Sequence, residues 1–378
     1  MLIVLDSKIP FAETAFKRIG EIRLLKTSDI SSKAVANADA LVVRSETKVD
    51  RQILDGSKVK FVGTSTIGFD HVDREYLSAR HIGFASAPGS NAMSVADYIL
   101  AALLEVEAVK NFSLRGKSIG IVGFGNTGSR TAGKAKALGM QVLLNDPPLQ
   151  RATGDEKFHP LDELMSCDVL SLHVPLTRSG EDPTFHLFDE KRIRSMKKGS
   201  ILINTSRGSV VETQGLRKSL DNEQLLGAVL DVWENEPAID AGLLKRTLLG
   251  TPHIAGYSVE GKITGARMIY ESLCIHFALN VPWDVPTDAA GTMNCEIPEK
   301  KDDENAIRAL VRQVYDIRRD DELLRKTLEM PVEEHGAYFR KLRASYPVRH
   351  EFSAARVSTG AERGSLRGTL SSLGFSVR

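Results

Sequence analysis

The stretch KSIGIVGFGNTGSRTAGKAKALGMQVLLND (117–146) decides how this chain folds. An apolar run leads into a glycine-rich turn, a helix-length segment and a second apolar run, which predicts a strand, a turn, a helix and a parallel strand. In the turn, Gly123, Gly125 and Gly128 form a G-x-G-x-x-G pattern. Such a turn lets the backbone approach a pyrophosphate at the positive end of the helix. The stretch therefore predicts a dinucleotide-binding unit.

The end of this stretch indicates which dinucleotide binds. Asp146 follows the second predicted strand, 23 residues after Gly123. A carboxylate at this place binds the ribose hydroxyls and repels a 2′-phosphate, so we expect NAD and not NADP. The alternative is that Asp146 only caps a turn before Pro147 and Pro148.

The same alternation of strands and helices extends in both directions. Short apolar runs predict strands at 2–6, 40–45, 60–66, 82–87, 168–175, 200–206, 225–232 and 248–254. Long amphipathic patterns predict helices at 90–112 and 258–280. This rhythm predicts an α/β fold with two Rossmann-like, doubly wound parallel sheets. We expect an NAD-binding domain at 93–255, inserted into a domain made of 1–92 and 256–280.

The tail, 281–378, differs in texture. The segment VPWDVP (281–286) leads into a polar linker. Helical patterns follow at 304–326 and 332–345, and a strand–helix–strand finish at 353–378 predicts a smaller α+β domain. One helix carries an apolar stripe, which forms either the core of its own domain or a contact with a second copy of the chain. The stripe consists of Ile307, Leu310, Val311, Val314 and Ile317.

The composition excludes several classes of protein. In 378 residues, 50 lysines and arginines balance 49 aspartates and glutamates, so no net charge draws the chain to nucleic acid or an anionic membrane. No uninterrupted run of 18 apolar residues predicts a membrane span. The three cysteines are too scattered for a disulfide framework or a zinc site, which favours a cytoplasmic protein without a metal.

Three segments follow predicted strands of the dinucleotide unit: NTSRGSVVE (204–212), VLDVWENEP (229–237) and TPHIAGYS (251–258). The carboxyl ends of parallel strands line the ligand crevice of such sheets, so we expect Arg207, Glu236 and His253 to converge there. Taken singly, each is more often an ordinary loop residue. Together they suit the oxidation of a 2-hydroxy acid, because arginine holds the carboxylate, histidine takes the hydroxyl proton and glutamate orients the histidine.

The motifs GFGNTGS, HVPLT (173–177), NTSRGSVV, LDVWENEP and TPHIAG resemble the D-isomer-specific 2-hydroxyacid dehydrogenase family over about residues 1–280. The resemblance implies an NAD domain inserted into a substrate (lid) domain, homodimers made through the long helix predicted at 90–112, and His253 as the acid/base. It also implies an NAD site lined by Gly123, Gly125, Asn126, Thr127, Gly128, Asp146, Val174, Ser206, Arg207, Gly208, Asp231 and Gly256. Val174 stands where the family has threonine, so a side-chain hydrogen bond to NAD is not expected there.

A narrower resemblance, over the whole chain, is to the branch of this family that acts on a phosphorylated four-carbon 2-hydroxy acid. It rests on VRSETKVD (43–50), TSTIGFDHVD (64–73), HIAGYSVEGK (253–262), VYDIRRDDELLRK (314–326) and SLGFSVR (372–378). It implies that Ser45, Thr66 and Tyr257 contact the substrate and that 281–378 forms a dimerisation domain.

A phosphorylated substrate needs cationic or N–H donors at the far end of its pocket. The candidates are Arg44, Arg343, Arg349 and Arg356, although each of the three tail arginines is more often a solvated surface residue. Two alternative functions remain open at this point. One is a family member acting on another acid such as 3-phosphoglycerate, and the other is a non-catalytic NAD-sensing scaffold.

Overall fold

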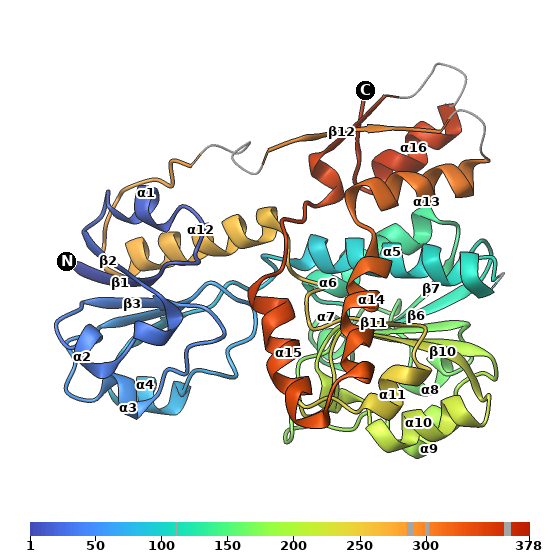
Figure 1. Ribbon diagram of the computed structural model, residues 1–378, viewed down its shortest axis with the longest axis horizontal. Coiled ribbons are helices and arrows are strands. Elements are labelled where there is room, and N and C mark those ends of the chain that lie inside the picture. Colours follow the sequence, from blue (N-terminus) through green and yellow to red (C-terminus); the bar gives the residue numbers. More distant parts are fainter. Residues whose placement is uncertain (111, 286–290, 299–301, 359–363) are drawn as a thin grey trace. The chain divides into compact units, whose positions relative to one another are not determined.

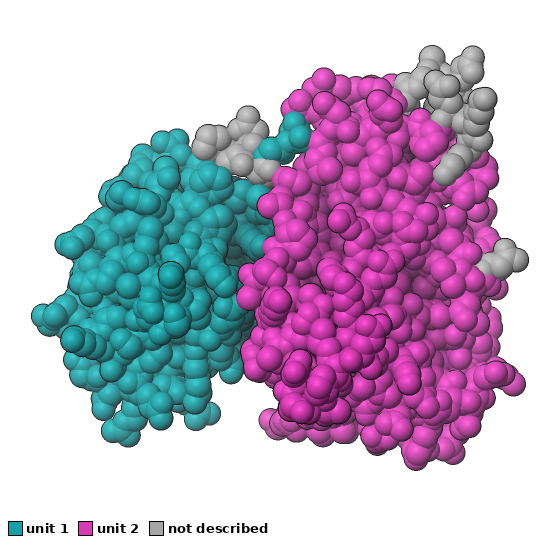
Figure 2. Space-filling model, viewed as in Figure 1, with its two compact units in different colours: residues 1–91, 258–292 teal, residues 92–257, 293–378 magenta. Residues whose placement is uncertain are grey.

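The computed structural model describes residues 1–110, 112–285, 291–298, 302–358 and 364–378. The chain forms two compact units (Figure 2). Unit 1 consists of Met1–Asn91 and Ser258–Thr292, and unit 2 of Ala92–Tyr257 and Met293–Arg378. The chain thus leaves unit 1 after its first 91 residues and returns to it at Ser258.

Unit 1 is a parallel sheet with helices packed on it (Figure 1). The strand order is β2-β1-β3-β4-β5, and the strands are β1 (Leu2–Asp6), β2 (Glu21–Leu25), β3 (Ala40–Val43), β4 (Phe61–Thr64) and β5 (Gly83–Ala85). The helices are α1 (Ala12–Phe16), α2 (Ser32–Val35), α3 (Arg51–Leu54), α4 (Arg74–Ala79) and α12 (Val259–His276). Helix α12 begins where the Ser258 hydroxyl accepts the backbone N–H of Gly261 at 3.0 Å, as an N-cap does.

Unit 2 holds a parallel sheet of order β11-β10-β9-β8-β6-β7. Its strands are β6 (Ser118–Val122), β7 (Gln141–Asn145), β8 (Val169–Leu172), β9 (Ser200–Asn204), β10 (Leu225–Leu230) and β11 (Leu249–Gly250). The helices of this part are α5 (Ala92–Lys110), α6 (Asn126–Ala137), α7 (Pro147–Thr153), α8 (Leu161–Leu164), α9 (Glu190–Ser195), α10 (Thr213–Asp221) and α11 (Ala241–Arg246). The order reverses beside β6, which creates the crevice where nucleotides bind in such sheets.

The tail contributes four helices and a small parallel sheet, within the described residues. The helices are α13 (Asp303–Val314), α14 (Ile317–Arg325), α15 (Val332–Ala344) and α16 (Gly364–Ser372), and the strands are β12 (Met293–Glu296), β13 (Ala355–Ser358) and β14 (Ser376–Val377). Residues 286–290 of the expected linker lie outside the described residues. The described tail from Met293 onwards groups with unit 2, so its treatment as a separate domain stays a prediction.

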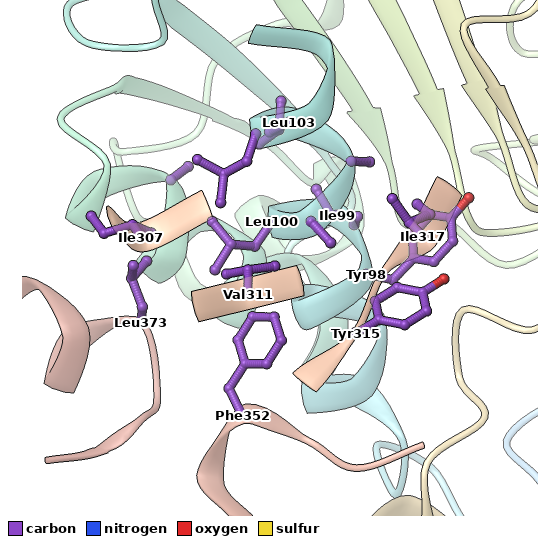
Figure 3. Packing of buried hydrophobic residues seen from close by; sticks show 14 of the residues in the cluster. Tyr98, Ile99, Leu100, Leu103, Ile307, Val311, Tyr315, Ile317, Phe352 and Leu373 are labelled. Atoms are coloured by element: carbon purple, nitrogen blue, oxygen red, sulfur yellow. The ribbon is translucent and has the colours of Figure 1, made fainter. Parts of the chain in front are cut away.

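The predicted apolar stripe is buried within this one chain, with its first four residues on α13 and Ile317 at the start of α14. Each of its five side chains is at most 9% exposed, and α13 packs on α5. Figure 3 shows Val311 beside Leu100 of α5, and the rings of Tyr98 and Tyr315 lie 6.2 Å apart in the same cluster. The hypothesis that this stripe contacts a second copy is therefore wrong, because helix α5 already covers it.

The expected fold class is confirmed: both large sheets are parallel, with helices around them, and the tail adds a small α/β layer. In the parts of the chain that the structure describes, no helix is both long enough and apolar enough to cross a membrane.

Candidate active site

The glycine turn after β6 has the geometry of a nucleotide-binding turn. Gly123 has φ +90°, and a Cβ there would lie 2.7 Å from the carbonyl oxygen of His173. A Cβ on Gly128 would lie 2.0 Å from the carbonyl oxygen of Gly123. At Gly125, the N-cap of α6, a Cβ would meet nothing within 4 Å. Two glycines thus permit close backbone packing, and the third leaves open space at the helix N-terminus that fits a pyrophosphate.

The residues expected to line this turn lie beside it. Asn126 and Thr127 form the first turn of α6. The side chain of Val174, which follows β8, packs against Gly123. A Cβ added to Gly123 would lie 3.1 Å from Val174 Cγ1. These positions suit backbone and packing contacts with a nucleotide.

Asp146 follows β7 and connects the glycine turn to the next helix. Its carboxylate accepts the backbone N–H of Phe124 at 2.8 Å and that of Leu149 at 3.0 Å. The second bond caps α7, which begins at Pro147. Asp146 therefore does cap a helix, as the alternative expected. Its bond to Phe124 also holds the carboxylate against the glycine turn. Its contact with ribose stays a prediction.

The loop after β9 is built around Asn204. Its side-chain oxygen accepts the Ser206 N–H at 3.0 Å and the Ser206 hydroxyl at 2.8 Å, and its amide donates to the Arg207 carbonyl at 2.9 Å. Next to it, a Cβ on Gly208 would lie 1.9 Å from the carbonyl carbon of Trp233. Glycine at 208 thus lets the Arg207 loop touch the backbone of the loop that carries Glu236. The Arg207 guanidinium donates to the Ser206 carbonyl at 2.8 Å, among other contacts.

Glu236 and His253 form a hydrogen-bonded pair. Oε2 of Glu236 lies 2.7 Å from Nδ1 of His253, and Oε1 accepts the backbone N–H of Trp233 at 2.7 Å. When Nδ1–H donates its hydrogen bond to the carboxylate, the lone pair of His253 Nε2 is the basic position of the ring. His253 sits at φ +57°, a left-handed conformation uncommon outside glycine, and its N–H donates to the Asp231 carbonyl at 2.7 Å.

The electrostatics keep Glu236 ionised. Burial by itself raises the pKa of this carboxyl group, but the charge and hydrogen bond of His253, the Trp233 N–H and the charge of Arg343 together lower it below its ordinary value. An ionised Glu236 is the form that accepts a proton-bearing imidazole nitrogen.

Asp231 organises the segment after β11. It is 1% exposed, and its carboxylate accepts the Thr251 hydroxyl at 2.6 Å and the backbone N–H groups of Ile254 at 2.7 Å and Ala255 at 2.9 Å. Gly256, expected to line the NAD site, follows directly. The predicted NAD contact of Asp231 is untested; the structure gives its carboxylate the task of holding the His253 segment.

In unit 1, the expected substrate residues lie at the carboxyl edge of the sheet. Ser45 is exposed after β3, and Thr66 follows the neighbouring strand β4. The Thr66 hydroxyl lies 2.7 Å from that of Thr64 and donates to the Gly68 carbonyl at 3.0 Å. Arg44 is partly buried directly before Ser45. Their contact with substrate stays a prediction.

The three candidate arginines of the tail differ in burial and in their hydrogen-bond partners. Arg343 of α15 donates to the Tyr257 hydroxyl at 3.1 Å, and its charge acts on Glu236 of the Glu236–His253 pair. Arg349 is only 5% exposed and donates to the Ile254 carbonyl at 3.2 Å, so it supports the backbone after His253. Arg356 is exposed on β13. No sequence pattern distinguishes these three.

Sequence reasoning missed a second histidine–glutamate pair. His186 Nε2 lies 2.6 Å from Glu234 Oε1, and Glu234 also accepts the Thr213 N–H at 3.3 Å. Glu234 stands in the same loop as Glu236, so the pair ties that loop to the 178–186 segment. The ENE spacing in VLDVWENEP is the signal that two carboxylates share this loop.

Comparisons with known proteins agree with this geometry. Residues 104–255 match the NAD binding domain of the D-isomer specific 2-hydroxyacid dehydrogenases, and residues 291–374 match a domain of unknown function, DUF3410. The chain is 41% identical to the erythronate-4-phosphate dehydrogenase of Marinobacter nauticus over 387 residues, covering 100% of both. It is 42% identical to that of Pseudomonas syringae pv. tomato, covering 99% of both.

Solved structures show the same fold. The NAD⁺-bound 3-phosphoglycerate dehydrogenase of Entamoeba histolytica is similar with a TM-score of 0.63 and 25% identity, over 76% of this chain and 98% of that one. The D-lactate dehydrogenase of Aquifex aeolicus, complexed with NAD and lactic acid, gives a TM-score of 0.60 and 26% identity, over 74% of this chain and 96% of that one. The family match at the glycine turn confirms NAD as the cofactor expected there. This chain belongs to the D-isomer specific 2-hydroxyacid dehydrogenase family, within its erythronate-4-phosphate dehydrogenase branch.

Proposed function

We propose that this protein oxidises 4-phospho-D-erythronate at C2, giving 2-oxo-3-hydroxy-4-phosphobutanoate in the biosynthesis of pyridoxal phosphate. NAD, when bound, accepts the hydride from C2. The full-length similarity to erythronate-4-phosphate dehydrogenases supports this substrate over others. The observation that carries the chemistry is the 2.7 Å contact between Glu236 and His253.

His253 acts as the general base in this reaction. Its Nε2 takes the proton of the C2 hydroxyl as the C2–H bond breaks, and returns it in the reverse direction. Glu236 is a positioning residue, because its carboxylate fixes the ring orientation and stabilises the imidazolium that forms. Both stand at the carboxyl end of the sheet that carries the glycine turn.

Arg207 binds the substrate carboxylate in this proposal. A guanidinium offers paired N–H donors whose geometry matches a carboxylate. The Gly208 contact with Trp233 keeps the Arg207 loop against the loop of Glu236. Ser45, Thr66 and Tyr257 are proposed as further substrate contacts, on the resemblance alone.

The remaining alternatives concern substrate and activity. A preference for 3-phosphoglycerate would keep every residue role above and change only the acid. A non-catalytic NAD-sensing scaffold would keep the fold without turnover. The Glu236–His253 pair favours an enzyme, because an orienting carboxylate on an imidazole is what proton transfer needs.

The test is NADH absorbance with purified protein, NAD and 4-phospho-D-erythronate, with 3-phosphoglycerate, D-lactate and D-glycerate assayed in parallel. A 2-oxo acid is added in one arm to detect recycling of NADH in place. We expect turnover with phosphoerythronate above the others. Preference for another acid would overturn the substrate, and tight NAD binding without turnover of any acid would favour the scaffold.

A matched pair of variants tests the base. His253→Ala should abolish turnover and keep NAD binding. His159→Ala is the control, because His159 Nδ1 also lies near a glutamate, Glu163, at 2.9 Å, but on the surface. The control should retain wild-type turnover. Comparable activity of both variants would remove His253 from the reaction.

We also infer a homodimer in the cytoplasm. The three free cysteines are buried as thiols, which suits a reducing compartment. Because α5 is covered by α13 within one chain, the dimer would use a face other than the α13 stripe. Sedimentation equilibrium tests the dimer, and cell fractionation tests the compartment; a monomer, or recovery outside the cytoplasm, would contradict the respective inference.

A further inference from the structure

Arg343 is a tail residue whose charge acts on Glu236 and whose guanidinium contacts Tyr257, four residues after His253. It projects from α15, whose Phe339 is 1% exposed in the same apolar cluster as Trp233. One turn of that helix lies against Pro237, since a Cβ on Gly336 would be 3.5 Å from Pro237 Cγ. The helix is thus anchored beside the Glu236 loop by packing.

The guanidinium of Arg343 has few partners for a partly buried charge. One nitrogen, Nη2, donates to the Tyr257 hydroxyl at 3.1 Å, and its carbon lies 5.8 Å from the centre of that ring. The Nε atom is buried and has no hydrogen-bond partner. Among the residues that the structure describes, Arg343 makes no ion pair. Arginines removed from water are normally paired, so this one has capacity for an anion.

The Glu236 carboxylate does not supply that anion. Burial raises the pKa of Glu236, while His253 and then Arg343 lower it. The positive charge of Arg343 therefore interacts with the Glu236 carboxylate. Both oxygens of Glu236 are nevertheless occupied, by the Trp233 N–H and by His253. Arg343 therefore stands next to a satisfied carboxylate and keeps unused donors of its own.

The proposed reactants leave one anionic group to be assigned. The pyrophosphate of the cofactor belongs at the N-terminus of α6, and the substrate carboxylate at Arg207. What remains is the phosphate at the other end of the substrate, which lies roughly 5 Å from C2 by ordinary bond lengths. Tyr257, four residues after the base His253, holds the Arg343 guanidinium by a direct hydrogen bond.

We propose that Arg343, held by Tyr257, binds the substrate phosphate, so that the tail domain gives the enzyme its selectivity for phosphorylated acids. This rests on the proposed function. A guanidinium suits the role because two of its N–H groups can bind two phosphate oxygens at once, with charge-assisted hydrogen bonds. Arg343 is a binding residue here, and it takes no part in moving the proton.

The experiment compares 4-phospho-D-erythronate with D-erythronate, its unphosphorylated form, in wild type, Arg343→Met and Arg343→Lys. Lys341→Met is the matched control, because Lys341 is exposed on the same helix and points roughly 200° away around it. Inorganic phosphate is tested as a competitive inhibitor of every variant. Melting curves and NAD binding report folding, and Arg343→Lys keeps the test valid if the methionine variant does not fold.

We expect Arg343→Met to lower kcat/KM for the phosphorylated acid by on the order of 10- to 100-fold, mainly through KM. Its kcat/KM for D-erythronate should stay as in wild type, and inhibition by phosphate should weaken by a similar factor. Arg343→Lys should fall between, and Lys341→Met should match wild type.

Equal losses on both acids would overturn the proposal and make Arg343 a support for Glu236. Unchanged inhibition by phosphate in Arg343→Met would also overturn it. Failure of the wild type itself to oxidise 4-phospho-D-erythronate would refute the proposed function, and with it this assignment, before any variant is compared.

Discussion

Replacing Glu236 by Gln tests the catalytic pair with little change in shape. In the wild type, Oε1 accepts the Trp233 N–H and Oε2 lies against His253 Nδ1, both at 2.7 Å. A glutamine has one acceptor oxygen, and its NH₂ group only donates. The variant must therefore set the NH₂ group against one of two nitrogens that now carry a proton.

Either orientation of the amide is harmful. With NH₂ toward His253, Nδ1 must accept a hydrogen bond, so the neutral ring carries its proton on Nε2. In that tautomer Nε2 can no longer act as a base. With NH₂ toward Trp233, a buried backbone N–H loses its acceptor, which costs about 1–3 kcal/mol. We expect kcat to fall by on the order of 10²- to 10⁴-fold, the usual contribution of a positioned general base. The fold should persist, because typical stabilities are about 5–15 kcal/mol.

The assay is steady-state NADH formation with the phosphorylated acid, together with thermal melting of each variant. Glu163→Gln serves as control, since Glu163 pairs with the surface residue His159 at 2.9 Å. The control should keep both activity and stability. If Glu236→Gln kept both its kcat, to within about tenfold, and the wild-type melting temperature, neither orientation of the amide would be harmful and the argument would be refuted.

The same variant predicts a pH dependence of stability. Burial raises the pKa of Glu236, but His253, the Trp233 N–H and Arg343 lower it more, so the folded-state pKa lies below the unfolded value near 4.5. Such a group stabilises the fold above pH 4.5 and loses this contribution as the pH falls through the folded value. Urea unfolding should show wild type ahead of Glu236→Gln at pH 7 and the gap closing in acid. A constant gap would contradict this.

Other predictions concern packing and chemical reactivity. Gly208→Ala should lower activity and melting temperature because its Cβ would meet the Trp233 backbone. Gly133→Ala, at an exposed position of α6 with nothing within 4 Å, should instead stabilise the helix by about 0.5–1 kcal/mol. Asp231→Asn should destabilise the chain by about 2–3 kcal/mol in urea unfolding, because the amide oxygen cannot replace both carboxylate oxygens. Burial raises the pKa of Cys167 to about 11, so at pH 8 about 0.1% is thiolate and mass spectrometry should find it unmodified by iodoacetamide in the native chain.

The sequence was sufficient wherever local pattern and fold agree. The glycine turn, the buried strands and the long helices α5 and α12 all followed from periodicity, because strands covered on both faces read as apolar runs. Strand β2 (EIRLL) escaped notice: it lies at the edge of its sheet and carries charged residues at 21 and 23. Strand β12 (MNCE) is short and polar, so its sequence carries no strand pattern. It is extended because it pairs with β13.

The tail shows where pattern reasoning stops. The charged segment 304–326 was expected to be one helical stretch, but the structure breaks it at Tyr315, and α14 begins with Asp316 as its N-cap. The stripe of α13 was correctly seen as apolar, but a stripe does not reveal what covers it. Similarly, an arginine looks the same in sequence whether it faces solvent, as Arg356 does, or is buried, as Arg349 is.

The backbone that carries His253 is held from two sides, and this changes how the tail should be understood. On one side, the Asp231 carboxylate accepts the N–H groups of Ile254 and Ala255. On the other, Arg349 donates to the carbonyls of these same two residues and to that of Ser94 at 3.0 Å. Every one of these partners is buried, so none of the bonds is weakened by competition with water.

The two clamps come from distant parts of the chain, since Asp231 follows β10 and Arg349 precedes β13. Without Arg349, the carbonyls of Ile254 and Ala255 would lose buried donors, and the left-handed conformation at His253 would rest on Asp231 and on its own hydrogen bond to Glu236. The NAD-binding fold alone therefore does not position His253. The tail also holds the segment that carries His253, in addition to any role in association. This explains why its described residues from Met293 onwards group with unit 2.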